Sequence, residues 1–112
     1  THMAFAARIS GVPSLPGLSR DAIHQVVSQG SGRIRICYER ELLSTTRPQE
    51  GQMVVRWQVD RSGRVVDPAV IRDSLGLPGL KACVLAQVQS WVFPPCTARC
   101  DVTYPFEFLL HS

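Results

Sequence analysis

The segment that decides the fold is SWVFPPCTARCDVTYPFEF, residues 90–108. In this segment an apolar stretch meets two prolines, then a bend between two cysteines, and then residues that alternate at period two. Pro94 and Pro95 cannot donate a backbone hydrogen bond, and each disfavours helical geometry in the residue before it. We therefore expect a helix to end here, with Trp91 in its last turn, and the chain to reverse into a strand.

The final strand is expected from Asp101 to about Leu110. Alternation places four apolar side chains on one face: Val102, Tyr104, Phe106 and Phe108. Three others point away from that face: Thr103, Pro105 and Glu107. Because proline lacks the N–H that a central strand needs, Pro105 predicts that this strand lies at an edge of the sheet, with its nitrogen facing outward.

A hairpin is predicted upstream of the helix. Residues 52–59 alternate, Asp60-Arg61-Ser62-Gly63 forms a turn with glycine where positive φ is favoured, and a second strand opens at Val65. The spacing of the aspartates does not fit a calcium loop, so the turn is preferred. Pro68 marks the second strand as an edge. Of the three predicted strands, only residues 52–59 contain no proline, so this strand must lie in the middle. The order in the sheet is therefore second strand, first strand, last strand.

Two helices complete the predicted domain. Ser19 is a plausible N-cap for a first helix that runs to about Leu43. Gly30 and Gly32 lower the helix propensity, so a kink near Ser31 is one interpretation of this segment. The preferred interpretation is that a glycine allows close packing against a neighbouring element. The second helix runs from about Leu77 to Val92, with three core residues: Val84, Val88 and Trp91. The fold class is therefore α+β, with both helices on the apolar face of a three-stranded antiparallel sheet in the order 2-1-3.

Composition limits the functional classes. The chain has 112 residues, 45% of them hydrophobic and 19% charged, with a net charge of +3 from scattered basic residues. These values indicate one folded domain and argue against nucleic-acid binding. Thr1-His2-Met3 looks like a remnant of an expression tag, and residues 1–18 read as that remnant plus a flexible linker, which leaves residues 19–112 as the domain. No apolar run approaches the ~20 residues of a membrane span, so any signal or anchor would lie upstream.

Nothing in the sequence indicates catalysis. The three histidines lie in the tag region, early in the first helix and near the chain end: His2, His24 and His111. Glu39 and Glu41 flank Arg40 and read as a solvated helix face. The phosphate-binding and dinucleotide-binding glycine patterns are missing from the sequence. We expect no enzyme activity, no cofactor and no metal ligands.

Four motifs together carry a family resemblance. They are VVRWQVDRSGRVVDPAVIRDSLG (54–76), LKACVLAQVQSWVFPP (80–95), VTYPFEF (102–108) and LSRDAIHQVVSQGSGRIRICYEREL (18–42). The first three resemble the C-terminal domain of TonB: a hairpin with a DxxGxV turn, a helix with a W-x-F-x-P ending, and a closing strand. In the fourth motif, the segment from Ile34 to Leu42 around Cys37 and Tyr38 resembles the TonB-like domains of bacterial gliding-motility (AgmX/PglI-type) proteins.

The resemblance implies a periplasmic domain of an inner-membrane-anchored force transducer. Such domains grip a peptide of an outer-membrane or periplasmic partner by adding it as a strand, while an inner-membrane motor pulls through the upstream chain. The docking edge would be the outward backbone of Asp101, Val102, Thr103, Tyr104, Pro105, Phe106, Glu107, Phe108 and Leu109. Arg99 and Asp101 could steer a charged peptide.

Two other roles stay open. The same edge could pair with a second copy of the chain, which would make this an architectural or oligomerising domain. A TonB-type transducer for nutrient import across the outer membrane would also look alike in sequence. Two features depart from the family pattern: the Gly30-Ser31-Gly32 run inside the first helix, and the Cys96/Cys100 pair.

The four cysteines permit three pairings. Pairing Cys37 with Cys83 would tie the two helices together, and pairing Cys96 with Cys100 would shape the bend before the last strand. Both bonds imply an oxidising compartment, which for the family is the periplasm. A zinc site of four thiolates is a weaker reading because Cys37 and Cys83 are isolated from any close pair. Two free buried thiols with one local bridge remain a further alternative.

Overall fold

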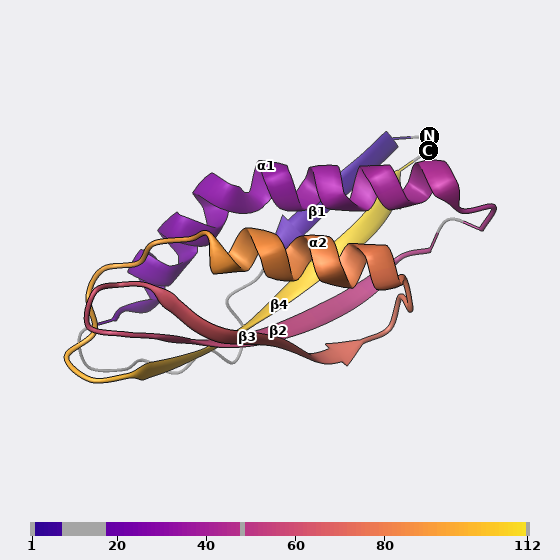
Figure 1. The fold of residues 1–112 in the computed structure, drawn as a ribbon. Helices are drawn as coiled ribbons and strands as arrows, with labels where there is room; N and C mark the ends of the chain where they lie inside the picture. Colours follow the sequence, from indigo (N-terminus) through magenta and orange to yellow (C-terminus); the bar gives the residue numbers. More distant parts are fainter. Residues whose placement is uncertain (1, 8–17, 48, 112) are drawn as a thin grey trace.

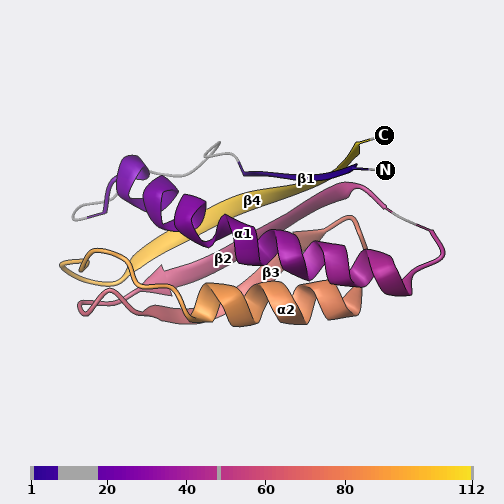
Figure 2. The same ribbon diagram turned by 90° about the horizontal axis from the view of Figure 1, so that it is seen from above.

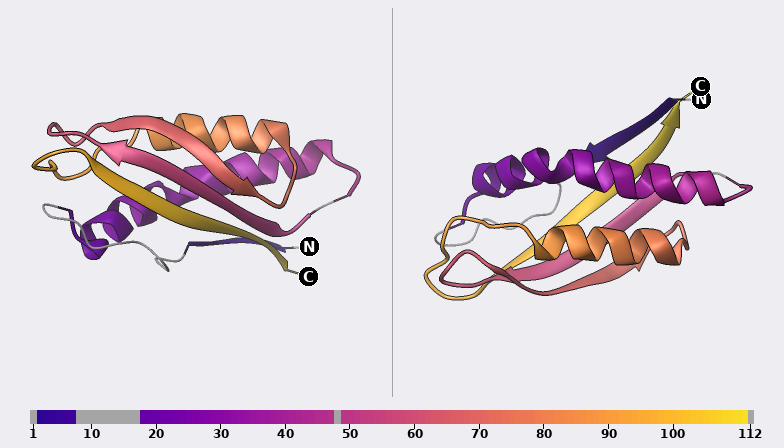
Figure 3. Two further views of the ribbon diagram at one scale, coloured as in Figure 1. Left: turned by 90° about the horizontal axis from the view of Figure 1, so that it is seen from below. Right: turned by 45° about the horizontal axis from the view of Figure 1, so that its top comes forward.

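The computed structural model describes residues 2–7, 18–47 and 49–111. The element order is β1 (His2–Ala7), α1 (Arg20–Ser44), β2 (Gly51–Val59), β3 (Val65–Asp73), α2 (Pro78–Gln89) and β4 (Cys100–His111). Both helices lie on one face of an antiparallel sheet, and the opposite face of the sheet has no helix against it (Figures 1 and 3). The predicted α+β class is therefore confirmed. Most of the predicted linker, residues 8–17, lies outside the described residues.

The sheet has the order β1-β4-β2-β3. Its last three members are the predicted strands in the predicted order, because β2 pairs with β3 on one side and with β4 on the other. The unexpected member is β1, which pairs antiparallel with β4 through six residue pairs, from His2↔His111 to Ala7↔Phe106. Figure 3 shows β1 and the end of β4 side by side, with both chain termini together.

The prediction that β4 is an open edge is wrong for its C-terminal half. The physical reason is that a proline removes only its own N–H, so Pro105 leaves every donor beyond it intact. The described pairing with β1 begins at Phe106, directly after that proline. Because residues 2–7 contain neither proline nor glycine, they can extend along those donors.

The helices run antiparallel, side by side across the sheet (Figure 2). α1 begins at Ser19, whose hydroxyl accepts a hydrogen bond from the amide of Ala22 at 3.1 Å, as the N-cap prediction requires. It continues without a break past Gly30. A Cβ on that glycine would lie 2.5 Å from Nε1 of Trp91, so close packing, and not a kink, accounts for the residue. The disulfide between Cys37 and Cys83 joins the two helices farther along.

The end of α2 differs from the prediction. The helix ends at Gln89, with Ser90 as its C-cap, well before Pro94. Trp91 follows the cap but stays buried in the core, as predicted. The next residue, Val92, forms an isolated β-bridge with Arg64. We infer that this pairing with the hairpin, more than the prolines, ends the helix.

The turn between β2 and β3 forms as predicted. Gly63 has φ of +85°, and a Cβ there would lie 2.0 Å from the carbonyl oxygen of Phe93, so only glycine fits. The Phe93 amide donates to the Gly63 carbonyl at 2.8 Å. This contact binds the turn to the segment that follows α2, and it holds the hairpin against the rest of the domain.

The core lies between the helices and the sheet. The four apolar residues of β4 expected on one face are all buried: Val102, Tyr104, Phe106 and Phe108. Tyr38 of α1 packs on Phe108 with ring centroids 4.9 Å apart. Its hydroxyl donates to the carbonyl of Gln49, and burial, with the nearby Glu50 carboxylate, raises the pKa of Tyr38 above 10. These contacts attach α1 to β4 and to the segment that enters β2.

Candidate peptide-binding edge

β4 provides the longest continuous backbone surface of the sheet. It pairs with β2 from Gly51↔Phe108 to Val59↔Cys100 without any shift in register. On its other side it pairs with β1, also without a shift. An uninterrupted register means that donors and acceptors of β4 project at regular intervals to both sides. The edge therefore has the geometry that strand addition needs, and a segment of the same chain already uses it.

The predicted docking residues separate into two groups. Leu109 pairs with β1, and residues 106–108 pair with both β1 and β2. Residues 101–105 pair with β2, and none of the other described strands pairs with them. Thr103, Glu107 and Leu109 are half-buried on the face without helices, whereas Pro105 is buried. The edge is thus a backbone surface with few exposed side chains of its own.

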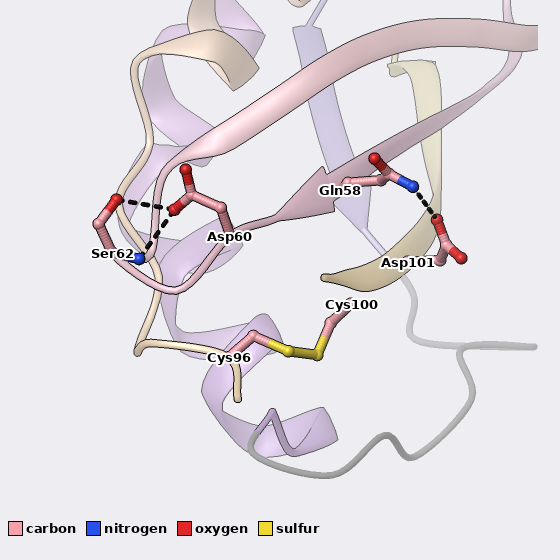
Figure 4. Close-up of a disulfide and its surroundings, with 6 residues drawn as sticks. All are labelled: Gln58, Asp60, Ser62, Cys96, Cys100 and Asp101. Atoms are coloured by element: carbon pink, nitrogen blue, oxygen red, sulfur yellow. Dashed lines mark hydrogen bonds between the residues drawn. A yellow bond between two sulfur atoms is a disulfide. The ribbon is translucent and has the colours of Figure 1, made fainter. Parts of the chain in front are cut away.

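The charges at the start of β4 are engaged within the sheet. The Asp101 carboxylate lies 3.8 Å from the Arg56 guanidinium and accepts a hydrogen bond of 3.1 Å from the side-chain nitrogen (Nε2) of Gln58. Arg99 in turn donates to the Gln58 side-chain oxygen at 3.2 Å. Both residues expected to steer a charged peptide are therefore occupied by partners on β2. The contact between Gln58 and Asp101 is drawn in Figure 4.

Both predicted disulfides are present. Cys96 and Cys100 enclose the bend that enters β4, and Cys37 and Cys83 join the helices. All four cysteines are paired in disulfides, so the two alternative predictions, a four-thiolate zinc site and two free buried thiols, are wrong. The amide of Cys96 also donates to the carbonyl of Asp60 at 3.3 Å, which attaches the bend to the β2–β3 turn. Figure 4 shows the Cys96–Cys100 disulfide of this bend. The start of β4 is therefore held by covalent and hydrogen bonds.

Asp60 lies at a surface hollow, and its carboxylate accepts several hydrogen bonds from the β2–β3 turn. A hollow of ≈ 500 Å³ is lined by Asp60, Arg61, Ser62, Ala98 and Arg99. One oxygen of Asp60 accepts hydrogen bonds from the Ser62 hydroxyl at 2.7 Å, the Ser62 amide at 2.9 Å and the Arg64 amide at 3.0 Å. These bonds, that from the Ser62 side chain first, lower the pKa of Asp60. The carboxylate therefore holds the turn and is not poised for acid–base chemistry.

The part of the chain that the structure describes contains no cluster of three or more His, Cys, Asp or Glu side chains able to hold a metal. His24 contacts the Ser28 hydroxyl one helical turn away, at 3.3 Å. Within the same residues, no helix is long and apolar enough to cross a membrane. The feature that sequence reasoning missed is β1, whose only signal was the alternation of Met3 and Phe5 with alanines in residues 2–7.

The family model described as the Gram-negative bacterial TonB protein C-terminal matches residues 44–110, more than half of the chain. The chain belongs to this family. No curated protein and no solved structure matches it. α1 lies almost entirely before the matched residues, so the helix whose Tyr38 packs on Phe108 of β4 is outside the match.

Proposed function

We propose that this TonB C-terminal domain binds a peptide of an outer-membrane or periplasmic protein by strand addition at β4. The observation that supports the proposal is the pairing of β1 with β4, because an extended segment already lies along that edge in unbroken register. Main-chain hydrogen bonds supply affinity in this mode of recognition, so few exposed side chains are needed. In this proposal the partner takes the position of β1.

The proposal extends to cellular context. We place the domain in the periplasm, as part of a force transducer of a gliding-motility machine, with an inner-membrane motor that acts through the upstream chain. The Ile34–Leu42 segment supports the motility assignment through its likeness to AgmX/PglI-type domains. The two disulfides support an oxidising compartment. Nutrient import across the outer membrane is the alternative, and the identity of the captured partner decides between them.

The test uses a photo-crosslinking residue at Leu109, which is half-buried on β4, in a Gram-negative host. Crosslinks from this position should capture an envelope protein, and the crosslinked segment is then made as a synthetic peptide. That peptide should shift the backbone amide resonances of residues 101–111. The matched control is the same probe at Arg72, on the opposite edge of the sheet. Equal capture from both positions, or resonance changes confined to other strands, contradicts the proposal.

Self-association through the same edge is the second candidate function. It is favoured by the identity of the occupant, because a strand of this chain that pairs with its own β4 can also pair with β4 of another copy. In that case β1 exchange would produce a dimer. Sedimentation at several micromolar concentrations separates the two: a monomer at all of them supports partner binding, and a concentration-dependent dimer supports self-association.

A further inference from the structure

The edge of β4 that accepts β1 is limited to a short frame. The pairs run from Phe106 to His111, directly after Pro105. We call residues 106–111 the docking frame. Here the amide of Leu110 also donates to the Glu50 carboxylate, which belongs to the segment that enters β2. The frame is therefore supported from the β2 side while its other side carries β1.

The side chains of the docking frame define what an added strand meets. Phe106 and Phe108 are fully buried on the helix side, and Tyr38 of α1 packs on Phe108. Glu107 and Leu109 are half-buried on the opposite face and, with Glu50, line a hollow of ≈ 460 Å³. Because directly opposed residues of an antiparallel pair share a face, positions opposite Phe106 and Phe108 belong to the helix side.

The occupant has a pattern that matches this frame. In register, Met3 lies opposite Leu110, Phe5 opposite Phe108, and alanines opposite the other three frame positions up to Phe106. Large apolar residues are thus two positions apart in the sequence of β1, at register positions on the apolar side of the sheet. Small residues stand opposite Leu109 and Glu107.

We propose that β1 is a resident occupant of the docking frame, and that the partner is an extended, antiparallel segment with large apolar residues opposite Leu110 and Phe108 and small residues between them. This inference rests on the proposed function, since it names the partner's chemistry and the step that precedes binding. The partner must displace β1. Its apparent affinity is therefore its intrinsic affinity multiplied by the fraction of molecules in which the frame is open.

The test compares three versions of the 112-residue chain: the wild type, a proline variant (Ala4→Pro, Ala6→Pro, Ala7→Pro) and a serine variant at the same three positions. Consecutive strand residues direct their N–H groups to opposite sides, so prolines at both 6 and 7 must remove a donor that faces β4. The serine variant keeps every N–H. Met3 and Phe5 are unchanged in both, and neither set of changes touches β4.

The probe is a fluorescent synthetic peptide with the sequence of residues 1–10, THMAFAARIS. We expect it to bind the proline variant at least about tenfold more tightly than the wild type or the serine variant, which corresponds to about 1.4 kcal/mol. The amide resonances of residues 106–111 should shift on binding. The same peptide with serine in place of its methionine and phenylalanine should bind weakly to all three chains.

A second measurement uses the wild type alone, and so does not depend on the proline variant folding. Excess probe should remove the strand-type chemical shifts of residues 2–7 while those of β4 persist. Equal probe affinity in the three chains, or unchanged shifts at residues 2–7 under saturation, overturns the inference. Strand addition by a captured partner at Leu109 would still stand in that case, because the crosslinking experiment judges it separately.

Discussion

β4 and β3 flank β2 on its two sides, and they differ in how regularly they pair with a neighbouring strand. β4 pairs with β2 and β1 in unbroken register. β3, at the opposite edge, pairs with β2 through two register shifts, each of which leaves an extra residue on β3. One bulge contains Ile71, and the other contains Asp67 and Pro68, with Asp67 at φ of +50°. Among the described strands, only β2 pairs with β3.

The difference shows how one sheet can offer a regular backbone to an added strand on one side only. Bulges, a proline and a left-handed residue each interrupt the regular spacing of donors and acceptors, so β3 is a poor template for another strand. β4 carries one proline and is otherwise regular beyond it. Protection of one edge and regularity of the other account for the pairing of β1 with β4 and not with β3. The predictions below test this contrast.

The largest expected effect is the loss of a β4 core side chain. Phe108→Ala should lower the free energy of unfolding by about 3–5 kcal/mol, because the phenylalanine is fully buried against Tyr38. The matched change at the other edge, Ile71→Ala, should cost within about 0.5 kcal/mol because its side chain is 55% exposed. Urea unfolding measures both. Similar losses would show that the two edges contribute equally to stability.

The two disulfides should also differ in how much each contributes to the free energy of unfolding. Replacing Cys37 and Cys83 together with alanine removes a bond that spans 46 residues, and in the chain-entropy model this costs about 4 kcal/mol. The same replacement of Cys96 and Cys100, four residues apart, should cost about 2 kcal/mol. Denaturant midpoints of the two double variants give the order. An equal or larger loss of stability in the second variant would contradict this order.

Straightening the β3 edge should create a second template. Deletion of Ile71 with Pro68→Thr removes one bulge residue and restores one N–H. We expect self-association to strengthen at least about tenfold, or about 1.4 kcal/mol. Sedimentation over a concentration series measures it, with Pro68→Thr alone as the control. If the double variant associates no more than the wild type, the irregularity of β3 does not protect it.

The smallest effect concerns the turn that leads into β3. The pKa of Asp60 is below its ordinary value of 3.8 because the hydroxyl of Ser62 and then the amide of Arg64 donate to the carboxylate. Folding therefore favours the ionised form. The resulting stabilisation is complete above the unfolded value and is lost as the pH falls through the lower folded pKa.

We expect the difference in stability between the wild type and Asp60→Asn to shrink as the pH falls below 3.8. Urea unfolding at a series of acidic pH values measures that difference. In the wild type, the amides of β3 should lose protection from hydrogen exchange before those of β4 over the same pH range. A difference that does not change with pH would show that the charge of Asp60 is not what holds the turn.

Much of the fold was predictable because its signals are local. Period-two alternation identified β2 and β4, Gly63 identified the turn, and Pro68 identified β3 as an edge. The end of α2 was placed too late because the pairing of Val92 with Arg64, residues far apart in the sequence, decides it. The candidate site was only half predictable. Its strand was recognised, but its occupant was interpreted as part of a tag remnant and linker.

By itself the sequence determined the types of the predicted elements, the core face of β4 and the order of three strands, and it left the pairing of the cysteines open. The determined features follow from side-chain periodicity and from the missing proline N–H, whereas the cysteine pairs are decided by which cysteines the fold brings together. Only the tertiary structure decided that β1 pairs with β4. Strand pairing is made by backbone groups that every residue but proline carries, so a short segment with weak side-chain preference takes the edge that the fold leaves open to it.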